Sequence, residues 1–340
     1  MKYIRIVPFL LILTIFPFHA FAQDDTEAFD FWLSEEFVKD LAQKNTILFP
    51  LSLKMEHRTS TVHTLAKDCE IHVAAKTSDG KKLAWPSAVV VEPPNLCKER
   101  GPGMSATASE KSLRETLWPS YFDAHIMNRD CLAIGFPRIF TEHAAGSAHP
   151  ANPNHVLEIH PALRIECGSF VLDMKKFLKA YRGMRSIQPT SAQECVSTRK
   201  LYVRKNQSRY EFLEEGGNNC GNFVVVDSHI NSEWVRALSN GGHTAIARVN
   251  FGCFDNFPCL GPYTLKLYTY PGTPEDAILT NFLTGTGNDA QNHYFHGMLT
   301  YDYFSIIKTL RKEDGAWIDP ADWTPVKYPI AMVVFGEIFE

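Results

Sequence analysis

The stretch NPNHVLEIHP at residues 152–161 alternates apolar and polar side chains, and this alternation is the strongest indication of the fold. In an extended chain, Leu157 and Ile159 lie on one face, while Glu158 and His160 lie on the other. His155 falls on the apolar side, where we expect a hydrogen-bonded core histidine. The stretch therefore predicts a β-strand with one packed face and one face that carries ionisable groups.

The same period of two recurs along most of the chain, separated by turn residues. It predicts strands at 46–54, 58–66, 69–76, 86–92, 131–140, 155–166, 201–204, 209–213, 224–227, 243–251, 262–270, 293–308 and 328–338. Helical spacing predicts helices at 28–44, 171–182, 231–238 and 274–282. Because helices do not alternate regularly with strands, a doubly wound fold is disfavoured. We expect a mainly β protein with two small OB-like barrels and a few interposed helices.

A chain of 340 residues, 45% of them hydrophobic and 21% charged, is long enough for two ordinary domains. The polar stretch at 183–194 is the predicted boundary between them. We therefore expect an N-terminal helix and an OB-like β domain at 23–185, and a second β-rich, OB-like domain at 195–340.

The first 22 residues have the pattern of a secretory signal peptide. Lys2 and Arg5 precede an apolar run at 6–18, and a small-x-small cleavage site follows at 20–22. The run is too short to span a membrane comfortably, and no other stretch approaches 18 apolar residues, so integral membrane association is not expected. We predict an exported protein, periplasmic or secreted, that begins at Gln23.

The eight cysteines all lie in the part predicted to be exported, where an even number indicates disulfides. Four precede residue 185 and four follow it, which predicts that each domain is cross-linked internally, and a local bridge between the last two is the one pairing we expect. The cysteines are Cys69, Cys97, Cys131, Cys167, Cys195, Cys220, Cys253 and Cys259.

The formal charge is −4, and it becomes −6 once the two positive charges of the signal peptide are removed. This acidic balance disfavours a general nucleic-acid binder. A basic hairpin is the local exception, and its candidate ligand-binding residues are Tyr202, Arg204, Lys205 and Arg209. Such a hairpin can follow a phosphate backbone while its rings stack on bases. The neighbouring glutamates favour an ordinary solvated hairpin, so nucleic acid and glycan remain disfavoured partners.

Two stretches carry the residues that suit catalysis. Strand alternation would place Asp68, Glu70 and His72 on one face, as it places Glu158 and His160 on theirs. Carboxylates and imidazoles in this arrangement can bind a divalent metal that positions a phosphodiester for hydrolysis. The alternative is that they make ordinary cross-strand hydrogen bonds and ion pairs on a half-exposed sheet.

Histidines are concentrated around the closing strand. His143, His149, His155 and His160 lie within eighteen residues, although their spacing matches no metal-specific motif. We take His72, His143 and His155 as candidate metal ligands, and a divalent metal as the cofactor that such a site would bind.

These motifs resemble those of a set of uncharacterised exported bacterial proteins. The resemblance rests on Asp68-x-Glu70-x-His72, on Glu92-x-Pro94 followed by Cys97, on residues 135–143, and on Asn154 ahead of Glu158-x-His160-Pro161. It covers residues 68–166, about 30% of the chain. This sequence differs in having Glu70 where Asp is usual and Cys69 inside the strand. The resemblance implies a small OB-like barrel and brings no established activity.

We therefore expect an exported, disulfide-stabilised binding or accessory protein whose ligand the sequence does not identify. The alternative is a metal-dependent, phosphodiesterase-like hydrolase that uses Asp68, Glu70, Glu158 and His160 as ligands or acid/base groups. A structural part of a cell-envelope assembly is a third possibility.

Overall fold

The computed structural model describes residues 28–64, 68–146, 148–180, 187–217, 220, 223–239, 241–253, 259–287 and 291–338. The predicted signal peptide, 1–22, lies outside the described residues. Within these ranges, no helix combines the length and apolar character needed to cross a membrane.

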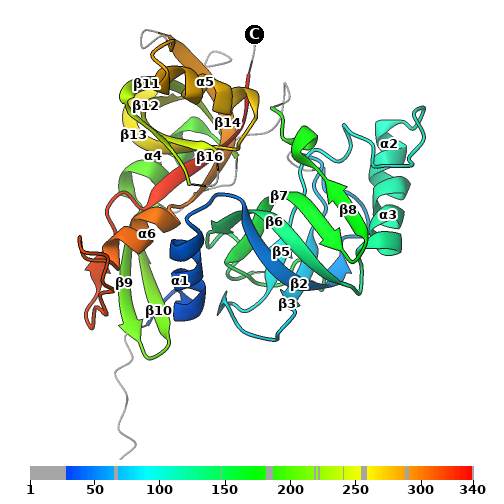
Figure 1. The fold of residues 1–340 in the computed structure, drawn as a ribbon, viewed down its shortest axis with the longest axis horizontal. Coiled ribbons are helices and arrows are strands. Elements are labelled where there is room, and N and C mark those ends of the chain that lie inside the picture. The colour runs from blue at the N-terminus through cyan, green and yellow to red at the C-terminus, as the bar shows by residue number, and fades with distance from the viewer. Residues whose placement is uncertain are drawn as a thin grey trace, which may run out of the picture.

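The first β-barrel closes because its shortest strand pairs on both sides (Figure 1). The order is β5-β3-β2-β6-β7, and a parallel contact between β5 and β7 completes the ring, while β8 extends β7 outside it. Helical segments fill the connection between β5 and β6. The strands are β2 (Phe49–Arg58), β3 (Val73–Thr77), β5 (Val89–Val91), β6 (Asp130–Ile139), β7 (Leu157–Cys167) and β8 (Phe170–Asp173), and the helical segments are α2 (Glu110–Ser112), a π-helical turn (Leu113–Leu117) and α3 (Trp118–His125).

The second barrel has the order β11-β12-β13-β16-β14 and is also closed. Here too the third and fifth strands in chain order, β13 and β16, are parallel, and a helix, α5, joins the third strand to the fourth. The elements are β11 (Phe223–Ala237), β12 (His243–Phe251), β13 (Leu260–Thr269), α5 (Pro274–Leu283), β14 (Asn292–Tyr301) and β16 (Ile330–Glu337).

Both barrels share one connectivity. When the strands of each are numbered in chain order, the ring runs 1-2-3-5-4 and returns to 1, with a helix between the third and fourth strands. This is the five-stranded Greek-key arrangement of the OB-fold. The prediction of a mainly β protein with two OB-like barrels is therefore confirmed.

A third, open sheet joins distant parts of the chain. Its order is β15-β9-β10-β1-β4, so the first strand of the described chain pairs with the hairpin that follows the first barrel. Ser34 ends β1 and caps α1, its side chain accepting a hydrogen bond from the Phe37 N–H. The elements are β1 (Phe31–Ser34), α1 (Glu35–Lys44), β4 (Ala84–Trp85), α4 (Pro189–Thr198), β9 (Lys200–Asn206), β10 (Arg209–Glu215), α6 (Tyr303–Thr309) and β15 (Thr324–Pro325).

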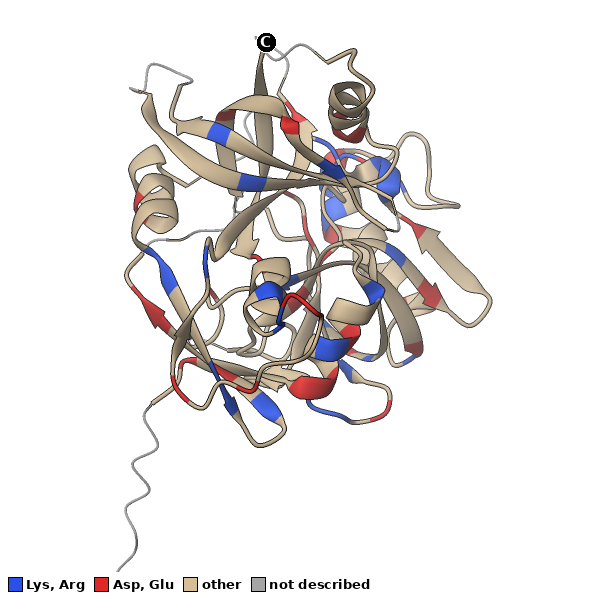
Figure 2. Cartoon of the chain, turned by 60° about the vertical axis from the view of Figure 1, so that its left-hand side comes forward, with Lys and Arg blue, Asp and Glu red and all other residues tan. Residues whose placement is uncertain are grey.

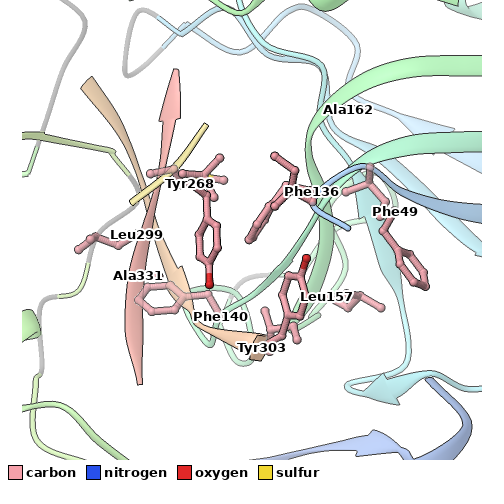
Figure 3. Close-up of a cluster of buried hydrophobic side chains, with 14 of the residues drawn as sticks. Phe49, Phe136, Phe140, Leu157, Ala162, Tyr268, Leu299, Tyr303 and Ala331 are labelled. Atoms are coloured by element: carbon pink, nitrogen blue, oxygen red, sulfur yellow. The ribbon is translucent and has the colours of Figure 1, made fainter. Parts of the chain in front are cut away.

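Aromatic side chains pack the two barrels against each other (Figure 3). The Phe136 ring of β6 lies 6.1 Å from that of Tyr268 and 5.6 Å from that of Tyr303, between centroids. The Tyr303 hydroxyl donates a hydrogen bond to the Thr46 carbonyl, 2.6 Å away. The barrels therefore share a buried apolar contact, and the outer surface of the first barrel is covered where the second lies on it.

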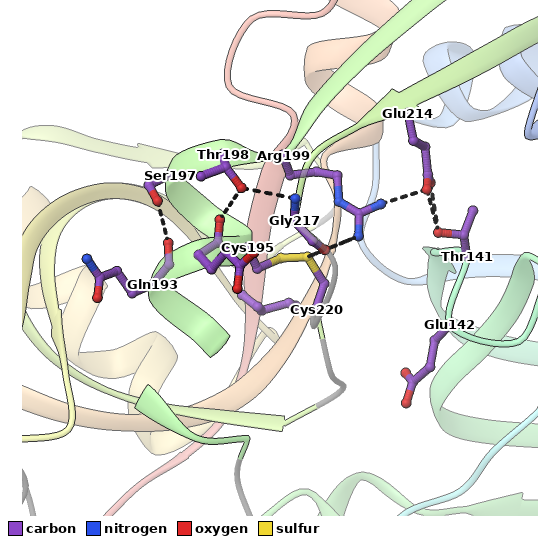
Figure 4. Close-up of a disulfide and its surroundings, with 12 residues drawn as sticks. Thr141, Glu142, Gln193, Cys195, Ser197, Thr198, Arg199, Glu214, Gly217 and Cys220 are labelled. Atoms are coloured by element: carbon purple, nitrogen blue, oxygen red, sulfur yellow. Dashed lines mark hydrogen bonds and ion pairs between the residues drawn. A yellow bond between two sulfur atoms is a disulfide. The ribbon is translucent and has the colours of Figure 1, made fainter. Parts of the chain in front are cut away.

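All eight cysteines form disulfides, and each bridge lies within one half of the chain, as predicted. The pairs are Cys69–Cys97, Cys131–Cys167, Cys195–Cys220 and Cys253–Cys259, the last being the local bridge expected from the sequence. Figure 4 shows Cys195–Cys220 beside Arg199, whose guanidinium also donates to Glu214 at 2.6 Å. Four disulfides are typical of a protein that leaves the reducing cytoplasm.

Several predicted elements are wrong. The helix expected at 171–182 is a strand, β8, and a short 3₁₀ turn (Lys175–Phe177), because β8 forms a hairpin with β7. The helix expected at 231–238 is instead the end of β11, where Val235, Arg236 and Ala237 pair with β12. The strand expected at 293–308 ends at Tyr301, and α6 follows it. The segment expected as a linker forms α4 in its second part.

Candidate metal centre

Glu158 and His160 project from the outer face of the first barrel, as strand alternation predicts. That face is not exposed to solvent, because the second barrel covers it: the His160 ring lies 6.0 Å from Phe223 and 6.2 Å from Phe335, between centroids. His160 is 0% exposed and Glu158 is 3% exposed. The half-exposed sheet considered from the sequence is therefore wrong, and the ionisable groups lie in a buried interface.

Several other ionisable residues converge on the same place, and we call the set the acidic-histidine cluster. Glu70 and His72 come from the segment before β3, Glu92 directly follows β5, and the rest lie on β7 or in the loop that leads to Glu70. The backbone fixes this convergence, because the Glu92 N–H donates to the Ile159 carbonyl at 3.0 Å. The cluster consists of Asp68, Glu70, His72, Glu92, Glu158 and His160.

Glu158 has a complete set of ordinary partners. Arg138, opposite it on β6, donates to Oε2 at 2.6 Å, and His155 Nε2 lies 2.8 Å from Oε1. Arg138 itself is 1% exposed and is held by Glu142 at 2.9 Å and by the Leu299 carbonyl of the second barrel at 3.1 Å. Glu158 therefore fits the structural interpretation, as a buried carboxylate satisfied by a guanidinium and an imidazole.

His160 has close neighbours of another kind. Its Nε2 lies 2.8 Å from Glu70 Oε1, and its Nδ1 lies 3.0 Å from Glu92 Oε2. Neither contact has hydrogen-bond geometry, and both ring nitrogens lack a hydrogen-bond partner among the described residues. Carboxylate oxygens thus lie close to both nitrogens of the imidazole, but they do not lie in the directions in which a ring N–H could donate a hydrogen bond.

Unpartnered atoms are concentrated in this cluster. Asp68 Oδ1, Glu70 Oε1, Glu92 Oε1 and His72 Nδ1 are all buried without a hydrogen-bond partner in the part of the chain that the structure describes. Buried polar atoms in native proteins are nearly always paired, and an exception calls for a water or ion. The cluster also contains four carboxylates beside one guanidinium, that of Arg138. Such an excess of buried negative charge needs protons or a cation to balance it.

The buried environment raises the pKa values of some groups in the cluster and lowers those of others. Burial, with Asp68 nearby, raises the pKa of Glu70 to about 8. Burial also opposes ionisation of Glu92, but His72 and His160 outweigh it and lower the Glu92 pKa to about 2. Burial would lower the pKa of His160, yet Glu70 and Glu92 raise it well above its usual value. The carboxylates thus favour a positive charge at this position.

The geometry suits a divalent transition metal. Nitrogen and oxygen ligands lie about 2.1 Å from zinc, so two ligands of a tetrahedral ion are roughly 3.4 Å apart. Glu70, Glu92 and His160 each offer one such atom, and these atoms lie within 4.8 Å of one another. The 2.8 Å contact involves Nε2 of His160 and the 3.0 Å contact involves Nδ1, so an ion bound to one nitrogen would use one of these contacts directly.

The strand predicted for Asp68, Glu70 and His72 is wrong. Residues 68–72 form no strand, apart from an isolated bridge between Glu70 and His63. The chain there is tied by the Cys69–Cys97 disulfide, and Cys69 has a positive φ of 58°, which breaks the alternation. Residues on both predicted faces are consequently buried.

Of the predicted metal histidines, His72 and His155 each join a candidate ligand group, and only His72 has an unpartnered ring nitrogen among the described residues. His155 is occupied, because its two ring nitrogens contact Glu158 and the Pro153 carbonyl. It is the hydrogen-bonded core histidine that the sequence indicated. His143 stacks on His155 at 5.1 Å between centroids, and it belongs to none of the candidate ligand groups among the described residues.

The basic hairpin does not present a free positive surface. Arg204 and Arg209 both donate to Glu211, which is 1% exposed, whereas Lys205 lies on the opposite face and pairs with Glu35 at 2.5 Å. Tyr202 donates to Glu215 at 3.1 Å. Figure 2 shows basic and acidic residues interspersed over the ribbon. The neighbouring glutamates thus neutralise these charges, as expected, but the pairs are largely buried and not solvated.

Three residues that the sequence argument did not select are central to the site. Glu92 carried a signal, since it opens the Glu-x-Pro motif that ends at Cys97. Arg138 and His63 carried none, because their roles depend on pairing with β7 and on the path of a loop.

No family model matches the chain, and no curated protein matches it either. The resemblance to exported bacterial proteins therefore rests on the motif alone.

Proposed function

We propose that this is an exported binding protein of two OB-type barrels that holds a divalent transition-metal ion in the acidic-histidine cluster. One observation carries the proposal: His160 is fully buried between two carboxylates at 2.8 and 3.0 Å, and neither ring nitrogen has a hydrogen bond. Imidazole with carboxylates is a ligand set typical of zinc and its neighbours.

Burial favours binding over catalysis at these residues. Glu70 and Glu92 are each 2% exposed, so a phosphodiester cannot reach an ion that they hold. A closed, fully ligated site is typical of structural metals, whereas catalytic metals keep an open position. The ion would link the two barrels, because its ligand His160 contacts Phe223 and Phe335 of the second.

The test is metal content and affinity. Purified protein, stripped with a chelator and titrated with Zn²⁺, is expected to bind metal and to gain thermal stability on binding. His160→Ala should abolish this binding, and Glu92→Gln should weaken it while preserving side-chain shape. His293→Ala is the matched control, because His293 is a buried histidine that contacts Glu337 at 2.9 Å outside the cluster.

Wild-type protein that binds no Zn²⁺, Co²⁺ or Mn²⁺ would refute the proposal. Equal loss of binding in His160→Ala and His293→Ala would also refute it, since the effect would then reflect general destabilisation. Circular dichroism of each variant separates loss of binding from loss of folding.

A metal-dependent hydrolase is the second candidate, and one observation favours it. A pocket of about 520 Å³ reaches His63, whose ring lies 5.3 Å from that of His72 between centroids. An enzyme should hydrolyse a phosphodiester such as bis(p-nitrophenyl) phosphate, and should lose this turnover in excess chelator. If no turnover is found with metal present, the binding function stands and the hydrolase is excluded.

A further inference from the structure

Glu70 and Glu92 each direct their two carboxylate oxygens at two different histidines. Oε1 of Glu70 lies 2.8 Å from His160 Nε2, while Oε2 lies 3.9 Å from His72 Nε2. Oε2 of Glu92 lies 3.0 Å from His160 Nδ1, while Oε1 lies 3.7 Å from His72 Nε2. Each carboxylate thus spans the two imidazoles and offers one oxygen to each.

We propose that the cluster is a dinuclear centre, in which Glu70 bridges an inner cation, held with Glu92 and His160, and an outer cation, held with His63 and His72. This inference rests on the proposed function, because it assigns a second ion to the same site. Pairs of divalent ions about 3.5–4 Å apart are an established arrangement in proteins. Glu70 belongs to both candidate ligand groups and offers one oxygen to each imidazole, so it provides the bridging ligand that such a pair needs.

The outer cation has its own third ligand. His63, Glu70 and His72 each offer one ligand atom within 4.8 Å of the others. Nδ1 of His63 and Nδ1 of His72 are buried and unpartnered, and the His72 side chain is only 10% exposed. Asp68 Oδ1, also buried and unpartnered, lies 3.6 Å from His63 Nδ1 and adds a carboxylate on this side.

The two ions would differ in their access to solvent. The side chains of His160, Glu70 and Glu92 are at most 3% exposed, whereas that of His63 is 37% exposed. His63 lines the pocket of about 520 Å³, together with His57, Arg58 and His149. The inner ion is therefore sealed between the barrels, and the outer ion exchanges through this pocket and keeps a coordination position for a small ligand.

The experiment counts ions and measures their coupling. Chelator-stripped full-length protein is titrated with Mn²⁺ or Co²⁺, with stoichiometry from calorimetry and elemental analysis. Two equivalents are expected, and electron paramagnetic resonance should show spin coupling between them. His63→Ala should weaken the second binding step at least roughly tenfold, and it should restore the uncoupled signal of one ion. His57→Ala, in the same pocket but outside the ligand set, should retain both ions.

Each result decides the matter. One equivalent in the wild type, or two equivalents without coupling, overturns the dinuclear centre and leaves the single-ion function in place. Two equivalents that persist unchanged in His63→Ala overturn the assignment of the outer site. No binding at all overturns both proposals. If His63→Ala does not fold, His72→Gln tests the same ion, because His72 belongs to the same ligand group as His63 and Glu70.

Discussion

His296 on β14 makes the stability of this protein depend on pH in a way that one substitution can isolate. The residue is 1% exposed, stacks on Phe223 at 5.6 Å between centroids, and has no hydrogen-bond partner on either ring nitrogen. Burial lowers its pKa to about 4. In the unfolded chain the pKa returns to about 6.5.

The sign and size of the effect follow from these two values. Because the folded-state pKa is lowered, the unfolded chain binds the proton first as pH falls. The contribution of His296 is therefore complete above about pH 6.5 and is lost at about 1.4 kcal/mol per pH unit between 6.5 and 4. The total loss is about 3 kcal/mol by pH 4, and about 2 kcal/mol is already lost at pH 5.

The assay compares His296→Phe with the wild type in urea unfolding at several pH values, with chelator present throughout. Other titrating groups act equally in both proteins, so the difference between the two free energies of unfolding reports His296 alone. The variant is expected to gain about 2 kcal/mol relative to the wild type between pH 7 and pH 5. If the free energies of unfolding of the two proteins differ by the same amount at every pH in this range, His296 does not contribute the predicted pH dependence.

Three further changes test the packing and the cross-links. Replacing both Cys131 and Cys167 by Ser opens a loop with a sequence separation of 36, and should cost about 4 kcal/mol in urea unfolding; an unchanged midpoint would contradict this. Arg204→Ala removes a charged donor from Glu211, which is 1% exposed, and should cost about 2 kcal/mol; a loss in oligonucleotide affinity with unchanged stability would favour the basic-hairpin hypothesis instead. In Gly135→Ala the new Cβ would meet a backbone oxygen of β7 at 2.3 Å, so we expect a loss of roughly 1–3 kcal/mol, and an unaltered thermal melt would show that the strands can separate freely.

The alternation of Leu157, Glu158, Ile159 and His160 was enough to predict a strand and to assign its faces. Period two fails where a strand is interrupted, as in β11, whose register shifts between Ile230 and Val235. The bulge leaves apolar residues at a helix-like spacing, and the pairing of Val235, Arg236 and Ala237 with β12 then determines the structure.

The site was less predictable than the fold. The sequence marked Glu70, Glu158 and His160, but which surface covers them depends on how the second barrel docks. Without that contact, Glu158 would be an exposed carboxylate, and Arg138 would have no buried partner to identify it. Glu158 has hydrogen-bond partners for its carboxylate, whereas Oε1 of Glu70 has none among the described residues. This difference depends on the directions of the side chains, which residue spacing does not predict.

The pairing of β1 with β10 bears on how the polypeptide matures. Phe31 aligns with Phe212. The pairing of β1 with β10 therefore requires a segment that lies about 180 residues further along the chain. During synthesis, β1 can pair with β4 once that strand has emerged, but the other edge of β1 stays open until the β9–β10 hairpin follows. Separate expression of the two halves would leave β1 and β10 on different polypeptides, and each half would display an open sheet edge prone to aggregation.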